Sequence, residues 1–121
     1  IARHGLPKDV DDLKNHLFVG HDDEQSRAPF ARWLRDLVPP EAFVYRATDI
    51  RNMYGPIAAG TGIGFLPMYD AMRDPALTQV IAPLEEWSAP LWLVTHVDLH
   101  RTTKVQTFLR FLKAQIKDLA L

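Results

Sequence analysis

Cysteine is absent from the sequence of 121 residues. Disulfides, thiolate nucleophiles and cysteine-ligated zinc sites are therefore excluded, and the chain is compatible with the reducing cytoplasm, where we expect it to act. An excess of charge of one sign is also lacking, because 14 Lys and Arg stand against 15 Asp and Glu. Such a balanced chain has no long-range field that would draw it to a nucleic acid backbone or an anionic membrane. Its length predicts one small domain.

Long apolar segments are lacking as well. The longest uncharged stretch, residues 52–69, contains prolines and four glycines, so it predicts a helix, a turn and a strand and not a membrane span. The first residues do not combine a basic start with an apolar core, as a secretory signal would. The sequence begins at Ile1 and enters structured sequence at once, and we expect it to be a fragment of a longer protein.

Helix-like and strand-like segments alternate along the chain. The predicted helices cover residues 10–16, 29–37, 50–59, 68–72 and 103–119, and the predicted strands cover 17–19, 43–46, 63–66, 77–81 and 91–96. This order predicts an α/β fold with a mixed, largely parallel sheet flanked by helices. In such folds ligands bind at the carboxyl ends of the strands.

The glycines at 60, 62 and 64 have the spacing of a phosphate-binding loop but the wrong surroundings. They follow a helix and enter a strand, whereas a nucleotide-binding fingerprint leaves a strand and opens a helix. We therefore interpret Gly60 as the end of a helix, and Gly62 and Gly64 as positions of a tight turn and close strand packing. Pro56, inside the preceding helix, predicts a kink.

Two polar clusters could carry chemistry. His96, Asp98 and His100 alternate and would share one face of a continued strand, where they could bind a divalent cation. The simpler interpretation is a solvated strand end followed by a turn. A second group within residues 16–23 is either a plain surface loop or part of a ligand site. No serine lies in a strained elbow motif of the kind that exposes a catalytic nucleophile.

The turn at Thr48, Asp49 and Ile50 lies where a strand ends and a helix begins. Free backbone N–H groups and the positive end of the helix dipole suit an anionic small molecule at such a turn. Thr48 or Asp49 caps this helix, and Asp49 can satisfy those donors itself. Capping and ligand binding can coexist here.

Three ordered segments carry a family resemblance. Residues 3–7, with the Asp-Leu pair at 12–13, resemble a hinge-crossing segment of LysR-type bacterial transcriptional regulators. Residues 57–67 resemble the helix end, Ala-Gly-x-Gly-Ile stretch and Leu-Pro of the same effector-binding domain. Residues 90–105 resemble its returning strand and the start of its final helix.

The resemblance implies a two-lobed domain of the type 2 periplasmic-binding-protein kind, present here in truncated form. Residues 1–10 would be the crossing from the first lobe, and 11–88 the second lobe. Residues 89–121 would be a return strand and C-terminal helix that belong to the first lobe. The DNA-reading winged helix-turn-helix of the family is not within these residues.

The resemblance also implies a function. A small-molecule effector would bind between the lobes and shift the conformation of a homodimer or higher oligomer on DNA. No catalytic residue, cofactor, metal or membrane contact is implied. The positions that match effector-binding positions of the family are Gly20, His21, Thr48, Asp49, Ile50 and Leu66. Pro56 departs from the family pattern, in which this helix is unbroken.

Two alternatives remain open at this stage. A solute-binding receptor of the transport type shares the two-lobed architecture, and a small metal-dependent enzyme could use the residues at 96–100. Aromatic acids, amino acids and other small metabolites all remain possible effectors. The apolar segments 91–94 and 105–119 would lack first-lobe partners in a fragment, and we expect them to drive self-association.

Overall fold

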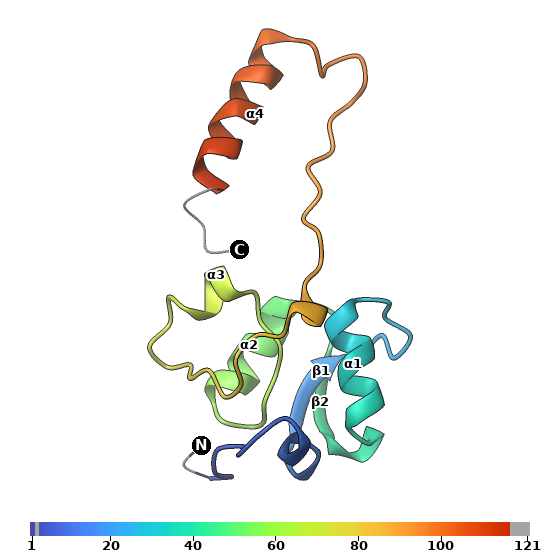
Figure 1. The fold of residues 1–121 in the computed structure, drawn as a ribbon, viewed down its shortest axis with the longest axis vertical. Coiled ribbons are helices and arrows are strands. Elements are labelled where there is room, and N and C mark those ends of the chain that lie inside the picture. Colours follow the sequence, from blue (N-terminus) through green and yellow to red (C-terminus); the bar gives the residue numbers. More distant parts are fainter. Residues whose placement is uncertain (2, 117–121) are drawn as a thin grey trace.

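The computed structural model describes residues 1 and 3–116, which form a small α/β unit followed by an arm (Figure 1). The elements, in chain order, are the 3-10 helix η1 (Asp11–Asn15), β1 (Phe18–His21), α1 (Pro29–Leu37), η2 (Pro40–Ala42), β2 (Phe43–Ala47), α2 (Ile50–Ala58), α3 (Met68–Ala71), η3 (Glu85–Trp87) and α4 (Thr103–Ile116).

The centre of the unit is a parallel pair of strands. β1 pairs with β2, and the register changes between Phe18, which faces Phe43, and Val19, which faces Tyr45. One extra residue, Val44, therefore lies in β2 as a β-bulge. On its other side β1 contacts Ile63 through an isolated parallel bridge, with Val19 N–H donating to the Ile63 carbonyl at 2.8 Å.

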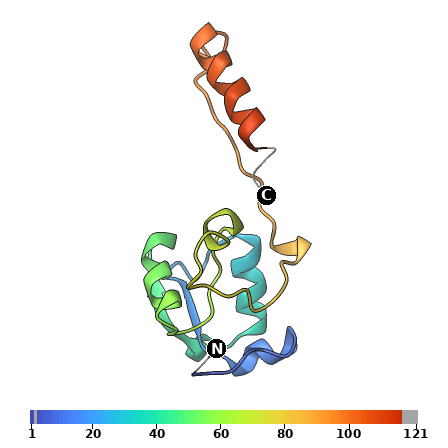
Figure 2. The same cartoon turned by 90° about the vertical axis from the view of Figure 1, so that its left-hand side faces the viewer.

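Helices cover the two faces of this sheet (Figures 1 and 2). Successive strand residues point to opposite faces, and the two buried residues of β1 accordingly enter different clusters. Phe18 packs with Leu34 and Val38 at α1, whereas Val19 packs with Met53 of α2. The described residues therefore form three layers, helix, sheet and helix, as the alternating sequence pattern predicts.

The ends of α2 follow from local chemistry. The Asp49 carboxylate accepts the Asn52 N–H at 3.0 Å, so the predicted cap is confirmed. At the other end Gly60 has φ +76°, and its N–H donates to the Ile57 carbonyl while the Thr61 N–H donates to that of Pro56. This is a Schellman motif, which confirms Gly60 as the residue that ends the helix. Pro56 lies within α2, and the helix continues past it to Ala58.

Three predicted strands are wrong. Residues 63–66 contribute only the bridge at Ile63, and residues 77–81 and 91–96 form no strand. A strand needs a neighbour for its N–H and C=O groups; within the described residues, 63–66 have one only at Ile63, and 77–81 and 91–96 have no strand partner. The exposure of Leu91, Trp92 and Val94, at 77, 79 and 84%, agrees with this absence of a partner.

The arm consists of the extended segment after η3 and of α4, which lie apart from the α/β unit (Figures 1 and 2). The predicted final helix is present from Thr103 to Ile116, and its last predicted turn, residues 117–119, lies outside the described residues. Leu109 is buried, while Phe108 and Phe111, on another face of α4, are exposed. No helix within the described residues is long and apolar enough to cross a bilayer.

Candidate ligand-binding cavity

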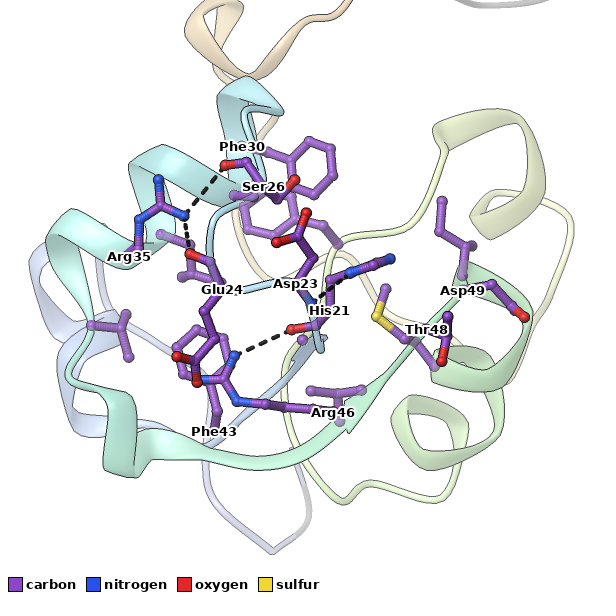
Figure 3. Close-up of a pocket in the computed structure, with 18 of the residues that line it drawn as sticks. His21, Asp23, Glu24, Ser26, Phe30, Arg35, Phe43, Arg46, Thr48 and Asp49 are labelled. Atoms are coloured by element: carbon purple, nitrogen blue, oxygen red, sulfur yellow. Dashed lines mark hydrogen bonds and ion pairs between the residues drawn. The ribbon is translucent and has the colours of Figure 1, made fainter.

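A cavity of about 710 Å³ opens at the carboxyl end of the two strands, between α1 and the start of α2 (Figure 3). Its volume lies within the range of about 300–1,000 Å³ that is usual for small-molecule sites. Its larger apolar side chains include Phe30, Leu34, Val38, Phe43, Ile50, Met53 and Phe65. Its charged and polar side chains are His21, Asp23, Glu24, Ser26, Arg35, Arg46, Thr48, Asp49 and Arg51.

The strand ends bring together most of the positions expected from sequence. Five of the six line this cavity, namely Gly20, His21, Thr48, Asp49 and Ile50. The sixth, Leu66, does not, and instead lines a second hollow of about 610 Å³ on the other side of Ile50, with Tyr54 and Asp70. Its neighbour Phe65, from the same segment, lines the first cavity.

The N-terminus of α2 carries its own anionic cap. Both carboxylate oxygens of Asp49 accept from Asn52, from its backbone N–H at 3.0 Å and from its Nδ2 at 3.1 Å. Figure 3 shows Thr48 and Asp49 on the α2 side of the cavity, apart from the group around Arg46. The dipole end of α2 is therefore occupied by an internal anion.

The loop after β1 is held by local hydrogen bonds. His21 Nδ1 accepts the Asp23 N–H at 3.0 Å and also lies 3.1 Å from an Asp22 carboxylate oxygen. The first contact needs an unprotonated Nδ1 and the second a protonated one, so they serve alternative states of the ring. Across the strand ends, the Thr48 hydroxyl donates to the other Asp22 oxygen at 3.2 Å.

Arg46 is one of four charged residues of the cavity that were not predicted from the sequence, the others being Glu24, Arg35 and Arg51. Its guanidinium carbon lies 4.4 Å from the centroid of the Phe43 ring, and its Nη1 donates to the His21 carbonyl at 3.2 Å. Its Nη2 lies 3.5 Å from a Glu24 carboxylate oxygen. Figure 3 shows the guanidinium between these three neighbours.

The bulge in β2 explains why Arg46 lies on the Phe43 ring, and why this contact could not be predicted from the sequence. In a regular strand, residues three apart point to opposite faces, so Phe43 and Arg46 would not meet. The extra Val44 reverses the alternation between them and places both over the end of β1. Gly20 leaves room for the ring, because a Cβ there would lie 2.7 Å from two ring carbons of Phe43. The sequence carries no clear signal for this bulge.

Arg35 lines the same cavity but binds the backbone of the loop after β1. Its Nη1 donates to the carbonyl oxygens of Glu24, at 2.6 Å, and of Ser26, at 3.3 Å. These bonds fasten the loop after β1 to the exposed side of α1, as Figure 3 shows. The loop that carries Glu24 is therefore anchored through its backbone carbonyl oxygens, separately from the Glu24 carboxylate.

The polar cluster of the arm has a simple local structure. His96 Nδ1 lies 3.5 Å from an Asp98 oxygen, and His100 Nδ1 lies 3.1 Å from the Thr95 hydroxyl. Within residues 1 and 3–116, no group of three or more His, Asp or Glu side chains is arranged to hold a metal ion. His96 and Asp98 thus share one contact in a turn, and His100 belongs to another.

A layered α/β unit with an amphipathic cavity at the carboxyl ends of parallel strands has the features of a ligand-binding domain. A model of the LysR substrate binding domain family matches residues 1–117, and the chain belongs to this family. The resemblance found in the sequence is thereby confirmed, as is the α/β fold of the type 2 periplasmic-binding-protein kind. This is an effector-binding domain of transcriptional regulators, a family that does not consist of enzymes. No curated protein and no solved structure gave a significant match.

Proposed function

We propose that this chain is the effector-sensing and dimerising part of a LysR-type DNA-binding regulator, and that the effector binds in the cavity at the carboxyl ends of β1 and β2. The observation that carries the proposal is that five positions expected from the family resemblance line one cavity of ligand size. The site residues proposed are therefore Gly20, His21, Thr48, Asp49 and Ile50, together with Arg46.

The mechanism that fits this site is a population shift. An effector held at the strand ends would contact the loop after β1 and the start of α2, and would favour one orientation of this lobe relative to the first lobe. In an oligomer bound to operator DNA through a winged helix-turn-helix, such a preference changes the spacing of the DNA-binding units. The regulator would act in the cytoplasm, and no covalent chemistry is involved.

Amide NMR titration with a library of small metabolites tests the site. We expect the ligands that bind to shift the amides of Gly20, His21, Thr48 and Ile50. A Thr48→Trp substitution places a large side chain at the cavity wall and should weaken those ligands by about tenfold or more, since a good fit is lost. Thr78→Trp, at an exposed position outside the cavity, is the matched control.

Two results would contradict the proposal. Shifts confined to the hollow around Leu66 and Asp70 would move the site away from the strand ends. Equal effects of the Thr48 and Thr78 substitutions would mean that the ligand does not occupy the cavity. For the regulatory part, a ligand that binds the domain should change the affinity of the intact regulator for operator DNA, measured by titration at fixed salt.

A further inference from the structure

The guanidinium of Arg46 is held in place by the protein but lacks a strong anionic partner. Its side chain is only 28% exposed, and the Phe43 ring and the His21 carbonyl position it from two directions. A partly buried cation has lost part of its hydration and therefore favours a closely bound anion. The structure thus presents a fixed cation at the end of β2.

The anion that Arg46 now has is weakly bound. The Glu24 carboxylate approaches through one oxygen at 3.5 Å, and its side chain is 67% exposed. Charge-assisted hydrogen bonds between a guanidinium and a carboxylate are shorter, about 2.7–2.9 Å, and often use both oxygens. The Glu24 backbone is held separately, through the bond from Arg35. Its carboxylate can therefore leave Arg46 without disturbing the loop.

Much of the remaining wall of the cavity is apolar, although Asp23, Arg35 and Arg51 also line it. Phe30, Leu34, Met53 and Phe65 line it from α1, α2 and the segment after α2. A ligand that fills this space needs an apolar body, because a polar one would lose hydrogen bonds to water without replacing them. The cavity therefore combines Arg46, a positioned cation without a strong anionic partner, with a largely apolar wall that suits hydrocarbon or an aromatic ring.

From these contacts we infer that the ligand is a small organic carboxylate with an apolar body, that Arg46 binds its carboxylate, and that Glu24 is an internal competitor which the ligand displaces. The inference rests on the proposed function, because it names the ligand class of the same cavity. Displacement exchanges one long single contact of Arg46 for a two-oxygen contact. Glu24 then returns to water, where its exposed side chain is already largely solvated. The competitor also gives selectivity, because a neutral ligand cannot replace the charge that Arg46 would lose.

The test is a set of probe pairs that differ only in charge: phenylacetate and phenylacetamide, indole acetate and indole acetamide, hexanoate and hexanamide. Each is titrated by amide NMR into the chain and its variants. In the wild type the carboxylates should bind more tightly than their amides. Arg46→Gln should weaken the carboxylates by about tenfold and leave the amides unchanged, because only the charged contact is lost. Arg46→Lys, which keeps the charge, should retain the preference for carboxylates.

Glu24→Gln gives the more discriminating test, because here we expect the affinity for carboxylates to increase. Removing the competing charge should tighten carboxylate binding by about threefold to tenfold, with no gain for the amides. Arg32→Gln and Glu41→Gln are the matched controls, since both residues are exposed and lie outside the cavity. Neither control should alter the ratio between a carboxylate and its amide.

Three results of these titrations would contradict the inference. If amides and carboxylates bind the cavity equally, and Arg46→Gln and Glu24→Gln change nothing, the inference fails while the proposed site stands. If inorganic phosphate alone displaces the carboxylates as effectively as they bind, the apolar body is irrelevant and the ligand class is wrong. If no probe shifts the cavity amides in the wild type or in Glu24→Gln while other metabolites of the library do, the inference fails and the proposed site stands.

Discussion

At the scale of single residues, Asp12 shows how a short polar network fixes the entry to the α/β unit. Its carboxylate accepts from Asn15 Nδ2 at 3.0 Å and from the Lys8 N–H at 3.0 Å, and its own N–H donates to Asp9 at 2.9 Å. The hydrogen bond from Asn15, followed by that from Lys8, holds the pKa of Asp12 below its ordinary value of 3.8. Hydrogen bonds to the charged form favour ionisation, which is the direction found here.

The lowered pKa of Asp12 predicts that the stability of the fold depends on pH. A carboxyl group with a lower pKa in the folded chain stabilises it above the unfolded pKa, and that contribution is lost as the pH falls through the folded value. We expect Asp12→Asn to be less stable than the wild type at neutral pH and the difference to shrink below pH 3.8, as measured by urea unfolding. Asn15→Ala removes the hydrogen bond that lowers the pKa of Asp12 most, and it should show the same trend. A difference that stayed constant with pH would contradict this account.

At the scale of elements, α2 is the part of the fold that the sequence defines best. Its start depends on a side chain, Asp49, and its end on a residue with positive φ, Gly60. Both signals are local, so sequence analysis found them. The predictions of strands at 77–81 and 91–96 were wrong because strand formation is not a local property. An apolar run becomes a strand only when another strand pairs with it.

The cap of α2 predicts a measurable loss of stability. Asp49→Ala removes the acceptor of the Asn52 N–H and should lower the free energy of unfolding by about 1 kcal/mol, as for other N-cap substitutions. Asp49→Asn keeps a side-chain acceptor and should recover most of this loss. Urea unfolding of the three proteins at neutral pH gives the comparison. Equal stability of the Ala and Asn variants would show that capping does not stabilise this helix.

At the scale of the whole molecule, the arm presents apolar surface that a folded domain normally buries. The exposed side chains include Trp92 and Val94 in the extended segment, and Phe108 and Phe111 on α4. Burying a large apolar side chain contributes about 1.5–3 kcal/mol, so this surface favours association with an apolar partner. The division into residues 1–10, 11–88 and 89–121 remains a prediction, under which the first lobe is the natural partner of the arm.

In the isolated chain, a second copy is the available partner. We expect light scattering after size exclusion to show a mass that rises toward the dimer as concentration increases. Phe108→Lys combined with Phe111→Lys should shift the association constant down by about tenfold or more, because the charges cannot be buried without partners. Met72→Lys, at an exposed apolar position on the α/β unit, is the control. A wild-type chain that stays monomeric at high concentration would contradict the expectation.

The sequence by itself determined the family, the α/β class, most helix boundaries, the caps at Asp49 and Gly60, and five of the positions that line the cavity. These follow from local chemistry and from the order of elements, which a single chain records directly. Only the tertiary structure decided that Leu66 lies outside the cavity, that residues 91–96 are not a strand, and that Arg46 lies on Phe43 beside Glu24. The reason is that strand pairing and the bulge at Val44 depend on contacts between segments far apart in the chain.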